Sequence, residues 1–537
     1  MDPLKIRKEI AKKLDNSPDE AKKLALELLA FEPKESANYK NLAICFARND
    51  ELDRCWAILE VGRKKIANSR TFFDEVEASI CRDFELFESL TDCILSLICA
   101  TDQTDQNKAE VLCRHSDVVV ATQILDQMDQ IVATNAKDGR VIAEVMFVLF
   151  KSTDDFKTRR IWIKRLLSEF DGDDQLDIRG KSNLATICLH YKQSLRAIRL
   201  LKELTKTKNP DLTLLLELAK ALHKNANNSE SLTVLQRLLE IDPKNKEANR
   251  IKAFILHYDD QTTIDEIQKA TLKYGDLIRS DKYAPAKNRN RLRPVRVGFF
   301  SHSFKTHPVG WMSAGFFCEV SKLQGDAEIH ILAAVSFDDF IAKTIQESGN
   351  SYHDLTHKTG DEIEQVIYDL HLDVLVDMDG MTAISRIENL LRKPAPVLVK
   401  WVGGLVGSMW LPEYDFLITD THQTPSHLED DFSEELILMD NSYVTYTPPP
   451  YGIDVLEPPT KYNGHVTFGC FNNAAKLSST CCETWSQILA ATADSVLILK
   501  DTAFGDNGTR KVIKENFRAH GIPSNRLEFR GGSPHEL

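Results

Sequence analysis

The sequence predicts two kinds of structure in succession: a helical solenoid over residues 1–280, followed by an α/β region in two halves. Three observations predict this order. Apolar residues recur at helical spacing through the first half, similar stretches reappear about 34 residues apart, and short apolar runs alternate with helical stretches after residue 296. The predicted fold class is therefore α followed by α/β, with parallel sheets in the second part.

Two stretches within the helical part align with each other. Residues 184–185, a Leu–Ala pair, precede the Leu–Ala pair at 218–219 by 34 positions, and Pro210 precedes Pro243 by 33. A period near 34, with a small residue where paired helices cross, is the tetratricopeptide signature. Each helix pair has one apolar face too large to leave in water, so neighbouring pairs stack and leave a concave groove.

Residues 65–175 keep the helical periodicity but lose the repeat register, so we expect degenerate repeats or irregular helices there. A groove of this kind usually holds an extended peptide from a protein partner. Repeats also hold subunits of homo-oligomers together, and the repeat sequence leaves these two roles open.

Composition and charge exclude several classes of protein. The chain has 67 basic and 80 acidic residues and a net charge of −13, unlike a general nucleic-acid binder. No apolar run approaches the ~18 residues of a membrane span, and the N-terminus lacks the apolar core of a signal peptide. The 11 cysteines show no paired CxxC spacing, which is typical of reduced thiols. We therefore expect a cytoplasmic protein that binds neither nucleic acid nor membrane.

The segment 281–295 is basic and bracketed by prolines, as expected of a linker. Short apolar runs of the kind buried in a parallel sheet then occupy 296–445, with helical stretches between some of them, and predict a first Rossmann-like half. These runs are RVGFFS, EIHILAAV, LDVLVDMDG, VLVKWVG, FLITD and LILMD.

A proline-rich crossover at 446–464 separates this half from a second one. Strand and helix alternate again over 465–537, and Thr480 and Glu483 fit a capping box at the first helix. Only three strands are predicted there, so we expect the second Rossmann-like half to be incomplete.

The turn after the first predicted strand, in GFFSHSFKTHPVGW, carries the first candidate site residue. His307 follows the strand and precedes a helix that begins near Val309, so it lies where a switch-point cleft forms. A histidine there can hydrogen-bond a substrate hydroxyl or phosphate, or act as a base. The alternative is a loop histidine that only caps the helix.

Two further constellations follow strands. In FGCFNNAAKLS, Lys476 lies near a helix start whose amides also attract anions, which suits a diphosphate, and Asn473 can read a base or sugar edge. Gly403 and Gly404 allow close backbone approach to a ligand. Neither a dinucleotide fingerprint nor a P-loop is present, and the acidic pair in DMD at 377–379 has no accompanying ligands, so we expect no metal.

These motifs, taken in order, resemble the tetratricopeptide-linked O-GlcNAc transferase family. The resemblance covers roughly 180–537 and includes RVGFFS with HPVG, LDVLVDMDGMT, RKPAPVLVKWVGG, DFLITD, VTFGCFNNAAKLS and ILHYDDQTTIDEI. It implies a GT-B glycosyltransferase behind peptide-binding repeats, with an acceptor-side lobe at 296–445 and a nucleotide-sugar lobe at 465–537. It also implies a reaction without metal or other cofactor.

The resemblance implies a role for each candidate residue. His307 matches the active-site histidine, Lys476 the lysine on the donor diphosphate and Asn473 the polar residue near the nucleotide, while Gly403 and Gly404 begin the loop beside the sugar. The implied reaction is inverting transfer of a sugar, GlcNAc from UDP-GlcNAc in the first instance, to Ser or Thr of a protein held by the repeats. SPINDLY-like members transfer fucose instead, so the sugar stays open.

The chain also departs from the family pattern. Met381 stands where bacterial relatives commonly have histidine, the loop at 403–409 reads GGLVGSM, and the expected remaining nucleotide contacts do not occur before Leu537. These departures favour a rival hypothesis, a non-catalytic repeat scaffold with a degenerate or truncated transferase body. A third hypothesis, glucosylation of asparagine, fits less well because that group has a different N-terminal helical domain.

Overall fold

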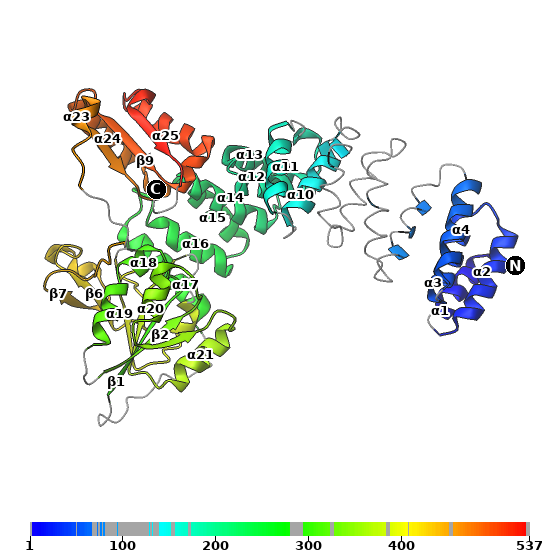
Figure 1. Ribbon diagram of the computed structural model, residues 1–537, viewed down its shortest axis with the longest axis horizontal. Coiled ribbons are helices and arrows are strands. Elements are labelled where there is room, and N and C mark those ends of the chain that lie inside the picture. The colour runs from blue at the N-terminus through cyan, green and yellow to red at the C-terminus, as the bar shows by residue number, and fades with distance from the viewer. Residues whose placement is uncertain are drawn as a thin grey trace. The chain divides into compact units, whose positions relative to one another are not determined.

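The structure, a computed structural model, describes residues 3–14, 16–49, 51–66, 139–151, 156–169, 173–279, 294–322, 327–382, 387–405, 407–449 and 455–532, together with single positions between 72 and 132. The chain divides into two compact units, residues 1–208 and 209–537. The predicted order of helices followed by a parallel α/β region is confirmed (Figure 1).

The first unit is helical throughout its described part. Its helices are α1 (Pro3–Lys13), α2 (Pro18–Phe31), α3 (Ser36–Arg48), α4 (Leu52–Lys65), α10 (Gly139–Lys151), α11 (Phe156–Glu169), α12 (Ile178–His190) and α13 (Ser194–Leu204), with a 3-10 turn at Asp173–Gln175. Small residues such as Ala43 are fully buried where helices meet, as the repeat pattern predicts. The hydroxyl of Tyr39 donates to the carbonyl oxygen of Pro33 at 2.9 Å, which fixes the turn before α3.

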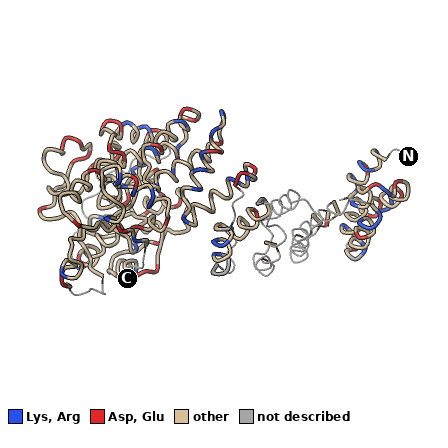
Figure 2. The backbone as a smooth tube through the Cα atoms, turned by 90° about the horizontal axis from the view of Figure 1, so that it is seen from above, with Lys and Arg blue, Asp and Glu red and all other residues tan. Residues whose placement is uncertain are grey.

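Basic and acidic residues are interspersed along the described helices (Figure 2). Many of them pair: Arg7 with Glu32, and Arg196 with the buried Asp173. The described surface of the helices therefore carries mixed charge.

The second unit begins with four more helices: α14 (Leu212–Lys224), α15 (Asn228–Ile241), α16 (Lys246–Leu256) and α17 (Ile264–Ile278). Ala219 is fully buried beside α15, and Ser231 donates its hydroxyl to the carbonyl oxygen of Ala219 at 2.7 Å. A capping box of Thr263 and Glu266 begins α17.

These four helices group with the α/β region, although the sequence places a domain boundary at 280. The reason is packing. Tyr274 and Ile278 of α17 belong to the same apolar core as Leu375 and Leu411 of the α/β region. At Gly275 there is no room for a side chain, because an added Cβ would lie 2.6 Å from Leu411.

The first lobe, residues 294–445, is built on a parallel sheet of seven strands in the described part of the chain, ordered β3-β2-β1-β4-β5-β6-β7. The strands are β1 (Val295–Ser301), β2 (Ala327–Ala333), β3 (Ser351–Asp354), β4 (Val374–Asp377), β5 (Val397–Lys400), β6 (Phe416–Asp420) and β7 (Glu435–Met439). Six of the seven were predicted. The short edge strand β3, with sequence SYHD, was missed because it has no continuous apolar run.

Successive residues of the central strands pack on opposite faces of this sheet. Phe300 and Leu332 contact one core, whereas Phe299 and Ile331 contact the other. Helices cover both faces (Figure 1). They include α17, α21 (Gly360–Asp369) and α22 (Ile387–Leu390) on the first, and α18 (Pro308–Trp311), α19 (Ala314–Val320) and α20 (Phe340–Gln346) on the second. The sheet is thus buried on both sides, as its apolar runs predicted.

The second lobe, residues 455–532, has its own parallel sheet, ordered β10-β9-β8 among the described residues. Its elements are α23 (Thr460–Asn463), β8 (Thr467–Cys470), a 3-10 turn η3 (Ala474–Lys476), α24 (Ser479–Ala491), β9 (Val496–Lys500), α25 (Asn507–Ala519) and β10 (Leu527–Arg530). One apolar core joins α24, α25 and the strands.

The predicted capping box at Thr480 and Glu483 is wrong. Helix α24 begins two residues earlier, and the hydroxyl of Ser478 accepts from the backbone N–H of Cys481 at 3.2 Å. The N–H of Thr480 instead donates to the carboxylate of Asp260 at 2.8 Å. Two residues therefore cap α24: Ser478 from its own segment and Asp260 from the helical repeats. The local sequence does not reveal the contact with Asp260.

Parts of three predictions lie outside the described residues: most of the linker 281–295, most of the degenerate region 65–175 and positions 450–454 of the crossover. Within the described ranges, none of the helices has the length and apolar character needed to cross a membrane.

Candidate functional site

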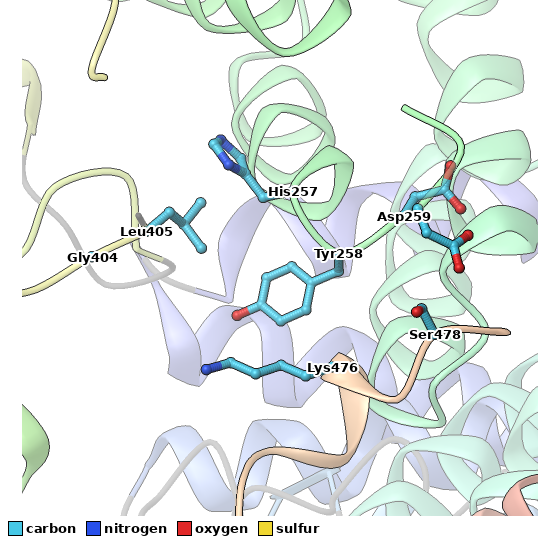
Figure 3. Close-up of a pocket in the computed structure, with 8 residues that line it drawn as sticks. His257, Tyr258, Asp259, Gly404, Leu405, Lys476 and Ser478 are labelled. Carbon is cyan, nitrogen blue, oxygen red and sulfur yellow. The ribbon is translucent and has the colours of Figure 1, made fainter. Parts of the chain in front are cut away.

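A cavity of about 360 Å³ lies in the second unit where three chain segments meet (Figure 3). It is lined by His257, Tyr258, Asp259 and Asp260 from the turn after α16, Gly404 and Leu405 from the loop after β5, and Lys476 and Ser478 from the turn after β8. The loops after β5 and β8 are at the carboxyl ends of parallel strands, where α/β folds bind ligands.

The turn after β8 presents Lys476 to the cavity. Asn473 begins this turn, and its side-chain oxygen accepts from the N–H of Ala475 at 2.9 Å. Ala474 and Ala475 are buried while Lys476 is exposed, with its Nζ 3.4 Å from the side-chain oxygen of Asn472. The amide of Asn473 thus has a capping role, and its side chain is not among those that line the cavity.

The N-terminus of α24, which the sequence suggests as an anion site, already contacts a carboxylate. Asp260 accepts from the N–H of Thr480 at 2.8 Å, and hydrogen bonds from Thr480 lower the pKa of this carboxyl group. An anion beside Lys476 would therefore compete with Asp260 for these amides.

The helical repeats supply an aromatic wall. The ring of Tyr258 packs edge-on against His223, with ring centroids 4.9 Å apart, and lies 5.1 Å from the ring of Phe254. Burial raises the pKa of the Tyr258 phenol, so its hydroxyl stays protonated. In Figure 3 the side chains of Tyr258 and Lys476 extend in the same direction, toward the side on which Gly404 and Leu405 lie.

His257 is next to this wall and is uncharged at neutral pH. Burial lowers its pKa to about 4, and its ring lies 6.2 Å from that of Trp410. The cavity is therefore lined on this side by a neutral imidazole and a neutral phenol, which can donate or accept hydrogen bonds to uncharged groups such as sugar hydroxyls.

The glycine loop after β5 packs backbone against backbone. An added Cβ at Gly403 would lie 2.1 Å from the carbonyl oxygen of Met378, and one at Gly404 would lie 2.6 Å from that of Asp379. Gly404 also has φ +88°, a left-handed conformation that favours glycine. Gly404 lines the cavity, whereas Gly403 lies behind it against the loop after β4.

Buried polar groups hold these two loops in place. The ammonium group of Lys400 donates to the carbonyl oxygens of Gly403 and Trp401. Burial lowers the pKa of Lys400, while the nearby carboxylates of Asp377 and Asp379 act in the opposite direction. Lys400 is not identified by the sequence pattern, because its neighbours form the apolar run of a buried strand.

The acidic pair in DMD has structural partners. Asp379 accepts from the hydroxyl of Ser301 at 2.8 Å and from the N–H of His302 at 2.6 Å, and Asp377 accepts from the hydroxyl of Tyr414 at 2.6 Å. Burial acts to raise the pKa of Asp379, but these hydrogen bonds outweigh it and the pKa is lowered. Across the residues that the structure describes, no three or more His, Cys, Asp or Glu side chains are grouped to hold a metal ion.

His307 caps the short helix α18. Its Nδ1 accepts from the N–H of Val309 at 3.3 Å, which places the ring proton of the neutral form on Nε2. Burial and the neighbouring Lys305 lower the pKa of His307, so the neutral form dominates at pH 7. Val309 in turn contacts the Gly403 position, so the His307 turn adjoins the glycine loop without lining the cavity.

The structure thus brings Gly404 and Lys476 into one cavity and leaves His307, Asn473 and Gly403 outside its lining. Met381, which stands where bacterial relatives commonly have histidine, is buried in the same apolar core as Tyr274 and Ile278 of α17. The contribution of residues 257–260 to the cavity was not predicted from the sequence. The family motif ILHYDDQTTIDEI was the available signal, since it places two aromatic side chains and two carboxylates at a single turn.

Comparisons with known proteins agree with this architecture. Residues 261–446 match the family described as Glycosyl transferase family 41. A curated Solanum lycopersicum protein named probable UDP-N-acetylglucosamine–peptide N-acetylglucosaminyltransferase SPINDLY is 27% identical over 301 residues, which cover 54% of this chain and 32% of that protein. An Arabidopsis thaliana protein with the same enzyme name and the designation SEC is 24% identical over 256 residues, covering 46% of this chain and 25% of that protein.

The chain spans about a third of the length of the SPINDLY relatives it matches. Among solved structures, a mutant of the Thermobaculum terrenum O-GlcNAc transferase superposes with a TM-score of 0.60 over 81% of this chain and 76% of that chain, at 19% identity. That likeness shows a shared fold. The family match shows in addition that residues 261–446 resemble a family 41 glycosyltransferase domain.

Proposed function

We propose that this chain belongs to an enzyme that transfers a sugar, GlcNAc from UDP-GlcNAc in the first instance, to Ser or Thr of a protein held by the helical repeats. One observation carries the proposal: Lys476 and Gly404 line the same cavity, beside the carboxyl ends of β8 and β5. A cation beside a glycine at a strand end suits a diphosphate joined to a sugar, because the cation attracts the phosphates and the glycine lets the sugar approach the backbone closely.

The proposed reaction is a direct displacement with inversion. The acceptor hydroxyl oxygen forms a bond to the anomeric carbon while the bond from that carbon to the diphosphate oxygen breaks. Negative charge develops on the leaving nucleoside diphosphate, and Lys476 stabilises it electrostatically. In this proposal Lys476 takes the place of a metal ion at the diphosphate.

His307 is proposed to act as a hydrogen-bond donor in this reaction. Its Nδ1 accepts from Val309, so Nε2 carries the proton and can donate to a substrate oxygen. To accept a proton from the acceptor hydroxyl instead, the ring would have to give up the cap or exchange its proton. The proton released by the hydroxyl then passes to the leaving diphosphate or to water.

A second candidate function is a non-catalytic scaffold that holds peptides. The observation in its favour is Asp260, whose carboxylate already contacts the N-terminus of α24 at the edge of the cavity. A cavity that carries its own anion at this point binds a second one less readily.

Calorimetric titration of UDP, UDP-GlcNAc and GDP-fucose into the chain separates these functions. We expect saturable binding of UDP and UDP-GlcNAc, and a Lys476→Ala variant should bind UDP about 10 to 100 times more weakly, the effect of one charge-assisted contact. Lys511→Ala is the matched control, because Lys511 is an exposed lysine of α25 outside the cavity. Equal UDP affinity in both variants would refute the role of Lys476, and no binding of any nucleotide would favour the scaffold.

A further inference from the structure

We propose that Asn228, at the start of α15, positions the turn that carries Lys476 and so couples the last helical repeats to the cavity. The contacts that support this are independent of ligand. The consequence for nucleotide binding rests on the proposed function, because it assumes that Lys476 contacts the diphosphate.

Asn228 is buried, with 6% of its surface exposed, and its side-chain amide makes three hydrogen bonds. Its side-chain nitrogen donates to the carbonyl oxygen of Tyr258 at 3.0 Å and to that of Ala475 at 2.9 Å. Its side-chain oxygen lies 2.8 Å from Nδ1 of His223. Both amide hydrogens and the amide oxygen therefore have partners.

These partners belong to two different walls of the cavity. Tyr258 lines the part of the cavity formed by the helical repeats, and Ala475 immediately precedes Lys476 in the turn that forms the adjacent part (Figure 3). A single side chain thus joins the two segments that carry Tyr258 and Lys476. Since η3 is only three residues long and Ala475 is buried, a shift of the anchored carbonyl displaces Lys476 with it.

The chemistry of this position calls for an amide. Two carbonyl oxygens must receive hydrogens, and an aspartate of the same size would instead present an oxygen where Asn228 presents its NH₂. The Asn228→Asp substitution therefore keeps the volume and turns two attractive contacts into repulsive ones. An alanine removes the contacts without adding repulsion.

Two other hydrogen bonds join the repeats to the second lobe at different places. The hydroxyl of Thr509, on α25, donates to the side-chain oxygen of Asn225 at 2.8 Å, and the N–H of Thr480 donates to Asp260. The Thr509 contact provides a matched control, because it anchors the same lobe to the same helices away from the Lys476 turn. A general loosening of the lobe would follow from Thr509→Ala as well, whereas a specific effect on the turn would not.

Hydrogen exchange of the full, ligand-free chain tests the positioning directly. The N–H groups of Lys476 and Leu477 donate to the carbonyl oxygens of Asn473 and Ala474, each at 3.0 Å, so they are protected while the turn is intact. We expect Asn228→Asp to accelerate their exchange about tenfold or more, as for the loss of about one net hydrogen bond, and Thr509→Ala to change it less than about twofold. Unchanged exchange in folded Asn228→Asp overturns the proposal, and Asn228→Ala supplies the same comparison if the aspartate variant does not fold.

A double-mutant cycle tests the consequence for binding. We expect Asn228→Asp to weaken UDP binding about tenfold when Lys476 is present and to have no further effect in the Lys476→Ala background, because it acts through that lysine. Additive effects would show that Asn228 acts elsewhere and would overturn the coupling. If the unmodified chain binds no UDP, the proposed function fails, while the exchange measurement still decides the role of Asn228.

Discussion

At the scale of single residues, the capping of α18 by His307 is compatible with its proposed role as a hydrogen-bond donor to the substrate. Its Nδ1 caps α18, as a loop histidine would, yet the same bond fixes the tautomer and leaves the proton on Nε2. A cap can therefore prepare a side chain for a second contact. The two roles call for variants that remove one and keep the other.

Replacing His307 with asparagine or alanine separates these roles. Both variants lack the imidazole Nε2, but asparagine is a good N-cap and alanine is not. We expect His307→Ala to lower the free energy of unfolding by about 1 kcal/mol and His307→Asn to leave it nearly unchanged. Both should lose the proposed transfer about 100-fold or more in a radiolabelled sugar-transfer assay. Full activity of His307→Asn would mean that His307 serves only as a cap.

His257 makes a pH-dependent contribution to stability. Its pKa in the folded chain is about 4, below the 6.5 of an unperturbed histidine, so the unfolded chain binds its proton first as the pH falls. The stabilisation is fully present above pH 6.5 and is lost as the pH falls toward 4, by up to about 3 kcal/mol.

Urea unfolding of the chain and of a His257→Gln variant between pH 7 and 4 measures the contribution of His257 to the free energy of unfolding. The variant should lose less stability over that range, by up to about 3 kcal/mol. Other histidines whose pKa is lowered, such as His223 and His307, contribute equally to both proteins and cancel in the difference. Parallel pH profiles would contradict the assignment.

At the scale of elements, the loops that follow β4 and β5 meet backbone to backbone at residues 378–379 and 403–404. This is why glycine stands at 403 and 404, and why the sequence pattern pointed to a close backbone approach. The glycine loop packs against the loop after β4 in the same lobe, and its Gly404 also lines the cavity.

A Gly403→Ala substitution tests that packing. Its Cβ would lie 2.1 Å from the carbonyl oxygen of Met378 and 2.5 Å from Val309, so the backbone must move. We expect the free energy of unfolding to fall by about 1–3 kcal/mol in urea denaturation. The matched control is Gly469→Ala on β8, where the nearest atom, in Phe471, is 3.8 Å away and the change should be below about 0.5 kcal/mol. A similar effect at both positions would refute the steric argument.

Elements with strong periodicity could be predicted from the sequence, and those without it could not. The apolar runs gave six strands of the first lobe, because strands buried on both faces read as continuous apolar sequence. The edge strand β3, with sequence SYHD, carries no such run. The capping box was placed wrongly because the N–H of Thr480 finds its acceptor, Asp260, 220 positions earlier in the chain.

At the scale of the whole molecule, the compact units do not follow the change from repeats to sheets. Helices α14–α17 are repeat-like in sequence but group with the α/β region. Helix α17 covers one face of the large sheet through Tyr274 and Ile278, and Arg279 pairs with Glu413 just beyond it. These helices therefore pack as part of the same compact unit as the α/β region.

Two fragments test this grouping. A fragment of residues 209–537 should unfold cooperatively and bind UDP within about twofold of the full chain, because it keeps all its cores. A fragment of residues 281–537 should aggregate or melt at lower temperature, since the face beneath α17 is then exposed to water. Size-exclusion chromatography and thermal unfolding measure both. Equal behaviour of the two fragments would contradict the grouping.

The candidate site could be predicted only in part, because some of its contacts join segments that are far apart in the sequence. Lys476 and Gly404 follow strands, and the rule that ligands bind at strand ends finds them. Asn228 meets Ala475 across 247 positions, and Tyr258 lines the cavity only because the repeats fold against both lobes. No local pattern encodes such contacts, since each partner is ordinary in its own segment.

The close packing of Gly403 and Gly404 against residues 378–379 limits which substitutions the site can accept during evolution. A wall made of backbone accepts few substitutions, so a library of variants selected for a different donor should retain it almost unaltered. The accepted changes should concentrate at 257–260, 476 and 478, where side chains line the cavity. New donor preferences would then arise in the turns after α16 and β8, even though the glycine loop is the more conspicuous feature of the sequence.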